Sequence, residues 1–386
     1  MTEWRQFKLK DILEPDGYIR GPFGSSLRRG ELKNEGIPVY EQEHAIKGIR
    51  KFRYYIDQNK FNELKRFCVK TGDIIISCSG TVGEVSVIKE EDPKGIISQA
   101  LLILRADKNV AYQPFLKYFL MSPYGKSSIT SRSDGSVQVN IAKRQVIENI
   151  DILLPPLTEQ KAIAEVLSSL DDKIDLLIRQ NKTLEDLAQA YFRKWFIEDI
   201  HNKICYKRFA DVAEFSKGKK PREIIEEQRK GYVRQILIDT FDTDKEYYTR
   251  PEGMIISTET DILMVMDGAS SGRVEIGFSG VVGSTIGMFR PKSDFKYPMF
   301  LYEFLKSNEE FIMDNTTGSA IPHADKKLIF ELEIPYFQEE KIQEFENFAL
   351  VLFNKRQNNR RQIRTLTKLR DTLLPKLISG EIRVKM

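Results

Sequence analysis

Cysteine is scarce in this sequence. The 386 residues include three cysteines, an odd number, and no two of them stand at CxxC spacing. A disulfide framework needs paired cysteines and a structural zinc site needs closely spaced ones, so neither is predicted. This usage is typical of a protein kept in a reducing compartment. The three residues are Cys68, Cys78 and Cys205.

Long apolar runs are missing as well. The opening stretch MTEWRQFKLK has no apolar signal core. No segment approaches the ~18 consecutive apolar residues that a membrane span requires. We therefore expect a soluble, cytoplasmic protein.

Catalytic constellations are equally hard to find. The histidines His44, His201 and His323 form no HExxH motif or ligand pair, so no metal site is predicted. The tripeptide at 125–127 has the form of a P-loop end, but leucine stands where the leading glycine belongs. The Leu-Pro-Pro-Leu at 154–157 lacks the leading Asn or Asp and the aromatic residue of the catalytic tetrapeptide of DNA amino-methyltransferases. We expect a non-catalytic binding and scaffolding protein that itself holds no cofactor and no metal.

The sequence does contain enough apolar material for sizeable cores. Hydrophobic residues make up 41% of the chain and aromatic residues 10%. This length leaves room for roughly two or three domains. The net charge of +4 argues only weakly for a nucleic-acid partner. Where the basic residues gather is more informative than their number.

A heptad pattern runs through residues 158–198 without a proline or glycine. It is sustained over about four heptads and predicts a coiled-coil helix, with Thr158 as its N-cap. About 40 residues of helix would be on the order of 60 Å long, which exceeds what an average globular helix needs. The apolar seam is Ile163, Leu167, Leu170, Ile174, Leu177, Leu184, Ala188, Tyr191 and Trp195, with the polar Asn181 within it.

A second segment of this kind occupies residues 338–374. The flanks of the first helix are acidic (Asp171, Asp172, Asp175, Glu185, Asp186), whereas those of the second are basic (Arg360, Arg361, Arg364, Lys368, Arg370). Such flanks suit an antiparallel pair as well as docking of a partner. The second seam is Ile342, Phe345, Ala349, Leu352, Arg356, Asn359, Ile363, Leu366 and Leu373.

The chain repeats itself at long range. Residues 73–80 resemble 261–268, residues 95–105 resemble 280–290, and a Gly-Ser pair precedes two basic residues at 135–144 and again at 318–327. The order is therefore globule, long helix, globule, long helix. Gly380 is expected to end the second helix, and 381–384 to form a strand near the N-terminal strand at 4–9. The alternative is two unrelated coiled-coil segments in an extended protein.

Both globules carry a basic cluster near their start. In globule one it begins within the Gly-rich loop at 17–29 and continues through Lys47, Arg50, Lys51 and Arg53. Such a cluster can be an ordinary solvated face, but its recurrence in both halves favours DNA contact. The candidate DNA-binding residues are Arg20, Ser25, Ser26, Arg28, Arg29, Lys33, Gln42 and His44 in globule one, and Lys217, Lys219, Lys220, Arg222, Arg234 and Gln235 in globule two.

Four segments together resemble the specificity subunit of type I restriction-modification systems. They are the stretches at 21–27, 80–83, 154–160 and 373–382, and the resemblance covers almost the whole chain. It implies an α+β fold in which two target recognition domains are joined and separated by an antiparallel pair of long coiled-coil helices, with a pseudo-two-fold internal repeat. The expected segments are 1–154 and 200–335 for the recognition domains, and 155–199 and 336–386 for the helices.

The resemblance also implies partners. Each globule would read one half of a bipartite double-stranded DNA target. Two methyltransferase subunits would bind S-adenosylmethionine, and restriction subunits would hydrolyse ATP with magnesium. Globule two departs from the family pattern, because the stretch at 217–222 is Lys-Gly-Lys-Lys-Pro-Arg. Three alternatives stay open: the recognition part of a type II system, a structural coiled-coil adaptor without a nucleic-acid role, and an unrecognised enzyme.

Overall fold

The computed structural model describes residues 3–132, 139–198, 205–243, 245–318, 321–336 and 339–385. The chain divides into two compact units, and each long helix contributes to both. Unit one comprises Met1–Lys173 and Leu366–Met386, and unit two comprises Ile174–Thr365. The segment boundaries expected from the sequence stay a prediction.

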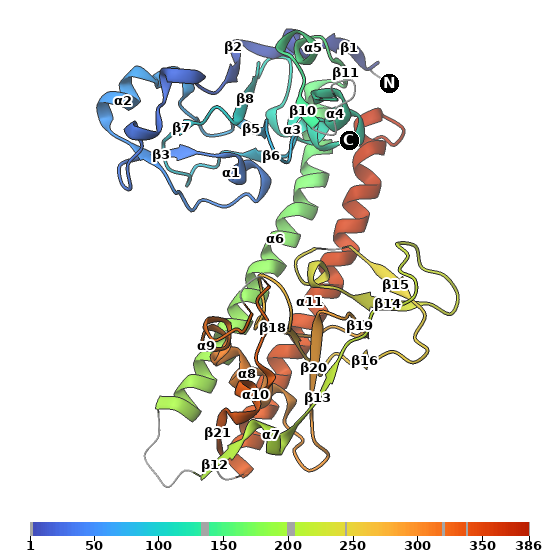
Figure 1. Ribbon diagram of the computed structural model, residues 1–386. Helices are drawn as coiled ribbons and strands as arrows, with labels where there is room; N and C mark the ends of the chain where they lie inside the picture. Colours follow the sequence, from blue (N-terminus) through green and yellow to red (C-terminus); the bar gives the residue numbers. More distant parts are fainter. Residues whose placement is uncertain are drawn as a thin grey trace. The chain divides into compact units, whose positions relative to one another are not determined.

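Unit one is built on a four-stranded sheet in the order β2-β8-β5-β6 and a three-stranded sheet in the order β4-β3-β7 (Figure 1). Its central strand β5 is buried along its whole length, as its run of three isoleucines favours. The strands are β1 (Arg5–Lys8), β2 (Leu13–Arg20), β3 (Ile37–Tyr40), β4 (Tyr55–Ile56), β5 (Ile74–Ser77), β6 (Val85–Val87), β7 (Ile96–Ile97), β8 (Leu101–Ala106), β9 (Thr130–Arg132), β10 (Val139–Ile141) and β11 (Asp151–Leu154). The short helices are α1 (Gln42–Ile46), α2 (Gln58–Glu63), α3 (Gln113–Met121), α4 (Pro123–Ile129) and α5 (Arg144–Glu148).

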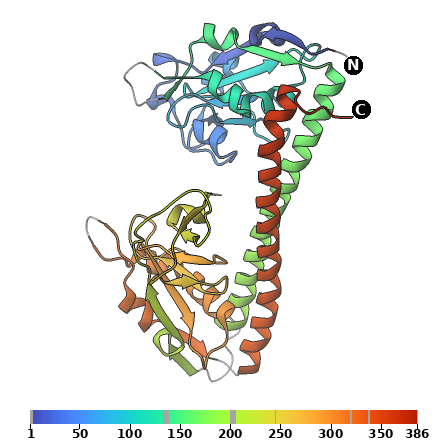
Figure 2. The same ribbon diagram turned by 90° about the vertical axis from the view of Figure 1, so that its right-hand side faces the viewer.

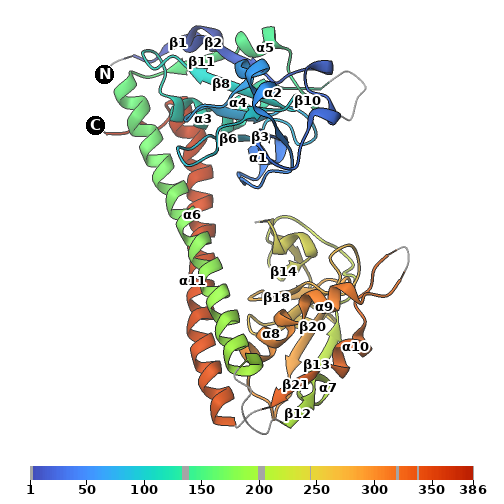
Figure 3. The same ribbon diagram turned by 90° about the vertical axis from the view of Figure 1, so that its left-hand side faces the viewer.

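Unit two repeats this plan with sheets β13-β20-β17-β18 and β15-β14-β19-β16. Figure 3 shows α7 and α10 next to strand β13. The strands are β12 (Cys205–Arg208), β13 (Ala213–Lys217), β14 (Val233–Ile236), β15 (Tyr247–Thr249), β16 (Ile256–Ser257), β17 (Ile262–Val265), β18 (Val274–Ile276), β19 (Gly280–Val282), β20 (Ile286–Pro291) and β21 (Glu333–Tyr336). The helices are α7 (Phe209–Val212), α8 (Pro298–Ser307), α9 (Glu309–Asp314) and α10 (Lys326–Glu331).

The duplication extends to single side chains. Asp73 and Arg105 form an ion pair at 2.6 Å between neighbouring strands of unit one, and Asp261 and Arg290 form the same pair at 2.6 Å in unit two. Both aspartates are almost fully buried, so each needs its arginine to offset desolvation of the charge. The internal repeat expected from the sequence is confirmed.

The two long helices are α6 (Leu157–Arg193), which continues as a π-helix to Glu198, and α11 (Glu339–Ser379). Within unit one, Asp171 of α6 accepts a hydrogen bond from Arg370 of α11 at 3.0 Å. Within unit two, Glu185 lies 3.3 Å from Arg356. Asn359 donates to Asn181 at 3.0 Å. Residue numbers therefore increase along α6 as they decrease along α11, so the two helices run antiparallel. The expected antiparallel pairing is confirmed (Figure 2).

The helices differ from expectation at their ends. α6 begins at Leu157, and the carbonyl of Pro156 accepts the N–H groups of the first turn, so Thr158 is not the N-cap. Near its other end the buried positions are Phe192 and Phe196, one residue beyond the expected seam. The shift begins at Phe192, before the π-helix starts at Lys194, because a four-residue step from the buried Ala188 replaces the three-residue step of the heptad.

The remaining seam residues are buried or half-buried. The fully buried members are Ile163, Leu167, Ile174 and Leu177, and the half-buried ones are Leu170, Asn181, Leu184, Leu352, Ile363 and Leu366. α11 runs through Pro375 and ends at Ser379, immediately before Gly380. The helix seam as an interface stays a prediction.

The C-terminal tail does not form the expected strand. Gly380 ends α11 with a positive φ of 76°, as expected for a helix C-terminus. Beyond it, residues 381–385 lie in non-strand conformation, and β1 pairs with β11 in a two-stranded sheet. The tail nevertheless reaches the N-terminal segment: the Arg383 guanidinium lies 5.4 Å from the Trp4 ring centroid and donates to Glu159 at 2.7 Å.

Candidate nucleic-acid interface

The loop after β2 presents basic side chains to solvent. Ser26, Arg28 and Arg29 are exposed, and neither arginine forms an ion pair with any residue that the structure describes. Phe23 is 62% exposed in the same loop. The side chain of Ser25 lies outside the described residues. This loop can contact a phosphate backbone without first breaking an internal salt bridge.

Arg20 has a different environment, at the end of β2. Its guanidinium lies 5.5 Å from the Phe23 ring centroid and beside the thiol of Cys78. Burial raises the pKa of the Cys78 thiol to about 12, and the charge of Arg20 partly opposes that rise. Arg20 is half-buried, so only part of its guanidinium group can contact a ligand.

Two more candidates of globule one engage local partners. Lys33 is exposed and pairs with Asp57 at 2.8 Å. Gln42 is half-buried, and its Oε1 accepts a hydrogen bond from the Ser79 hydroxyl at 2.9 Å. Gln42 thus lies across the Gly80 turn that follows β5.

His44 has no exposed surface for a DNA contact in this conformation, contrary to the expectation from sequence. It is fully buried, stacks on Phe52 with ring centroids 4.6 Å apart, and accepts the N–H of Glu41 at Nδ1. Its Nε2 then carries the proton and donates to the carbonyl of Lys51 at 3.1 Å. Thr240 has the same role in unit two, where its hydroxyl accepts the N–H at 237. His44 is therefore a structural capping residue.

Arg50 and Gln235 are also structural. The Arg50 guanidinium pairs with Asp92 at 2.8 Å and is 19% exposed. It also donates to the carbonyls of His44 and Val87. Gln235 is fully buried in β14, so the expectation that it contacts DNA is wrong in this conformation. Lys47, Lys51 and Arg53 stay exposed.

Globule two places its basic loop directly after β13. Lys219, Lys220 and Arg222 are exposed, and Lys219 donates to the carbonyl of Gly253 at 3.1 Å. Arg234 is half-buried in β14. Both globules therefore carry an exposed basic loop at the same place in the fold, after the outer strand of the four-stranded sheet.

Lys217 lies at the end of β13 in a polar cluster. Its ammonium is 3.0 Å from Asp267, and the same carboxylate accepts a hydrogen bond from Nδ1 of His323 at 2.7 Å. Burial alone would raise the pKa of Asp267, but the hydrogen bonds from His323 and Lys217 hold it below its usual value. Asp267 is therefore ionised at neutral pH and fixes the two other side chains in place.

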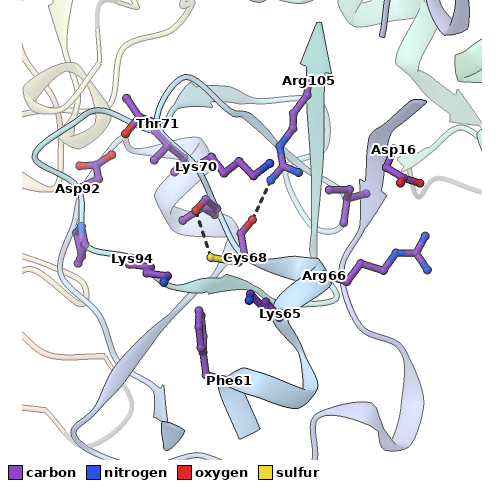
Figure 4. Close-up of a pocket in the computed structure, with 14 residues that line it drawn as sticks. Asp16, Phe61, Lys65, Arg66, Cys68, Lys70, Thr71, Asp92, Lys94 and Arg105 are labelled. Carbon is purple, nitrogen blue, oxygen red and sulfur yellow. Dashed lines mark hydrogen bonds between the residues drawn. The ribbon is translucent and has the colours of Figure 1, made fainter. Parts of the chain in front are cut away.

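A second basic feature in globule one is a pocket of about 690 Å³ (Figure 4). Arg105 lines it but is held by Asp73 and by the carbonyl of Cys68. Its other cations are exposed at the mouth, which makes the pocket attractive for phosphate oxygens. They are Lys65, Arg66, Lys70 and Lys94.

Sequence reasoning missed several of these residues. The short basic run at 65–70 was a visible signal for the pocket. The contact of Ser79 with Gln42 and that of Asp267 with Lys217 and His323 join residues far apart in the chain, so no local pattern could reveal them.

Two negative findings apply to the described part of the chain. It contains no group of three or more His, Cys, Asp or Glu side chains placed to hold a metal ion. Among the same residues, no helix has both the length and the apolar character needed to cross a membrane.

Comparison with known proteins gives a consistent result. The sequence profile of the type I restriction modification DNA specificity domain matches residues 1–186 and 201–359. The MjaIX type I specificity subunit of Methanocaldococcus jannaschii is 26% identical, over 99% of this chain and 94% of that protein. The HindI type I specificity subunit of Haemophilus influenzae is 23% identical, over 81% of this chain and 87% of that protein.

One solved structure shares the fold. The S subunit of a type I restriction-modification system from M. genitalium aligns with a TM-score of 0.61 at 18% identity. The alignment covers 99% of this chain and 96% of that one.

Proposed function

The chain belongs to the type I restriction-modification DNA specificity family, and from this premise we propose that it selects a bipartite DNA target, each globule reading one half-site. The observation that carries the proposal is the duplication itself. The two units share a buried frame, including the Asp73–Arg105 and Asp261–Arg290 pairs, yet carry different exposed polar side chains at equivalent places. Two similar scaffolds with different surfaces suit two related but distinct sequences.

The exposed basic loops would position each globule on the duplex. Exposed basic side chains that can contact phosphates are Arg28 and Arg29 in globule one and Lys219, Lys220 and Arg222 in globule two. Such contacts fix register and orientation but carry no sequence information. The cationic pocket of globule one adds attraction of the same kind.

In this proposal the chain performs no chemistry. Methyltransferase subunits would bind S-adenosylmethionine and methylate adenine, and restriction subunits would hydrolyse ATP with magnesium. This chain would contribute the choice of sequence and a platform for assembly.

The long helices are the proposed platform for the methyltransferase subunits. In unit two, apolar side chains on both helices face solvent: Leu176 is 41% exposed, Tyr191 39% and Val351 67%. A pocket of about 500 Å³ opens between Leu176, Leu184 and Lys355. Exposed apolar side chains on a helix pair are suited to docking of a partner protein.

The test is single-molecule mapping of N6-methyladenine in genomic DNA from cells that express this chain with its neighbouring methyltransferase subunit. We expect a split motif with a fixed gap that disappears when this chain is deleted. Exchange of residues 1–150 for those of a relative should change one half of the motif only. A continuous motif, or a change in both halves, would contradict the proposal.

Binding by the purified complex provides a second readout. Affinity for double-stranded DNA should fall steeply with salt, because phosphate contacts release counterions. A structural adaptor without a nucleic-acid role would show no such dependence.

A further inference from the structure

The two units can be compared position by position, because equivalent hydrogen bonds define the correspondence. The N–H of Gly21 donates to the carbonyl of Leu101 at 3.0 Å, and the N–H of Gly218 donates to that of Ile286 at 2.9 Å. A Cβ at Gly21 would lie 1.9 Å from the carbonyl oxygen at 98, and one at Gly218 would lie 2.1 Å from that at 283. Gly21 and Gly218 therefore occupy equivalent positions in the two units. Arg20 and Lys217, which immediately precede these glycines, are equivalent as well.

The turns after β5 and β17 are counterparts as well. In unit one Ser79 stands at this turn, and in unit two Asp267 does, each followed by a glycine with positive φ. A shared frame therefore holds different polar groups at one edge of the four-stranded sheet. The Asp–Arg pairs of the frame recur in both units, whereas the polar groups at this edge differ.

The set in unit two consists of Lys217, Asp267 and His323. The side chains of Lys217 and His323 are 50% and 48% exposed, whereas Asp267 is 23% exposed. Asp267 accepts from both neighbours, and the backbone of the His323 segment is bridged to Thr317 and Asp267. Two half-exposed donor groups are therefore held by a carboxylate beneath them.

The set in unit one consists of Gln42 and Ser79. The Ser79 hydroxyl donates a hydrogen bond to Oε1 of Gln42. The amide nitrogen of Gln42 then lies over Gly80, 3.0 Å from the position that a Cβ at Gly80 would take. The equivalent of Gln42 in unit two is Ile238, which packs into the core. The two units thus present different hydrogen-bonding groups.

We propose that these sets read the bases: Gln42 with Ser79 in one half-site, and Lys217 with Asp267 and His323 in the other. This inference rests on the proposed function and names its base-contacting groups. In unit two Lys217 itself begins the exposed basic loop, and in unit one Ser79 follows Cys78, which interacts with Arg20 at the start of the loop. Phosphate contacts of these loops would place each set against a groove. A fixed geometry supports discrimination, because preorganised side chains lose less freedom on binding.

The chemistry of each set predicts its preferred base. The Lys217 ammonium offers several donors, and guanine alone presents two acceptors, O6 and N7, in the major groove. Unit two should therefore select at least one guanine. The amide nitrogen of Gln42 can donate and the second lone pair of its Oε1 can accept, which suits adenine, a base that presents an acceptor and a donor together.

The experiment uses the full complex of this chain with its methyltransferase subunit. Variants Lys217→Gln, Asp267→Asn and His323→Gln are mapped by N6-methyladenine sequencing and by binding to a library randomised in each half-site. We expect preference for one base of the unit-two half-site to fall about tenfold or more, while the other half-site is unchanged. Gln42→Ala should relax the opposite half-site only.

Matched controls separate base reading from phosphate contact and from misfolding. Lys220→Gln and Arg222→Gln should weaken binding to all sequences alike and leave the motif intact. A thermal unfolding curve of each variant complex checks that it is folded. If the parent complex gives no split motif, the proposed function fails. If it does, and folded Lys217, Asp267 and His323 variants retain full preference in both half-sites, this inference is overturned while the proposed function stands.

Discussion

The Arg105 guanidinium donates two hydrogen bonds to the carboxylate of Asp73, from Nε at 2.6 Å and from Nη2 at 2.8 Å. Nη2 also donates to the carbonyl of Cys68, and the N–H of Lys70 donates to the carboxylate. Asp73 is 3% exposed. The pair therefore ties two strands and the preceding turn together at the base of globule one.

Loss of this arginine should be costly. Arg105→Ala leaves a buried carboxylate without its counter-charge, which typically costs about 3 to 5 kcal/mol of unfolding free energy. Chemical denaturation of the purified chain measures the change. Arg290→Ala should have a similar effect through Asp261, whereas Arg29→Ala, on an exposed loop, is the control and should have little effect. A loss below about 1 kcal/mol for both core variants would contradict this account of the frame.

Asn181 and Asn359 should set the register of the helix pair in unit two. Asn359 is fully buried and donates to Asn181 at 3.0 Å and to Gln180 at 3.4 Å, so Asn181→Leu removes the shorter of its two hydrogen bonds and should cost about 1 to 3 kcal/mol. The double variant Asn181→Leu, Asn359→Leu should recover that stability but populate more than one oligomeric state, because a polar seam residue specifies register. Denaturation and light scattering after size exclusion measure both effects. Unchanged stability and oligomeric state in the single variant would remove the register role.

Stability should depend on pH through Glu346. Its carboxylate accepts the N–H groups of Phe300 and Met299 at the start of α8. Burial raises the pKa of Glu346 to about 7, although these two hydrogen bonds oppose the rise. The folded state then holds the proton more tightly than the unfolded chain, whose ordinary value is 4.5. The stabilisation is complete below pH 4.5 and is lost as the pH rises through about 7.

Glu346→Gln removes this titration. We expect the unfolding free energy of the parent chain to fall between pH 5 and pH 8 by about 1 to 3 kcal/mol more than that of the variant. The exposed Glu344 lies on the same helix, and Glu344→Gln is the control, expected to follow the parent curve. Parallel curves for the parent and the Glu346 variant would show that this carboxyl does not titrate in the range.

The salt dependence of DNA binding should report the basic loop of globule one. Arg28→Gln and Arg29→Gln should each reduce the slope of log K against log salt by about one, as expected for a lost phosphate contact. Lys89 is 63% exposed elsewhere in the same globule, and Lys89→Gln is the control. Equal slopes for all three variants would place the phosphate contacts outside this loop.

The repeat and the long helices could be predicted from sequence because both follow from periodic patterns. Heptad spacing shows which residues of α6 are buried, as at Ile163 and Leu167, and paired motifs show that the two units share a fold. Heptad periodicity stops being informative at Phe192, where a four-residue step from Ala188 replaces the expected three-residue step and shifts the buried face.

The candidate interface could be predicted only in outline. A basic loop is visible in sequence, but burial is not: His44 looks like a base reader and is a buried cap, and Gln235 points into the core. The pairing of Lys217 with Asp267 depends on strands that are brought together only by folding. Local residue type shows which chemistry is available, and the tertiary fold decides which of it faces outward.

The core of unit one is completed late during protein synthesis. Leu374, Leu377 and Ile378 of α11 pack with Ile163 and Leu167 in that core, yet the ribosome adds them only after all of unit two. Until then a nascent unit one exposes the apolar surface that these side chains will cover, which favours chaperone capture or proteolysis. A nonsense mutation just before Leu374 would therefore be expected to damage the earliest-made globule most, so that quality control removes chains in which unit one lacks its final helical turns.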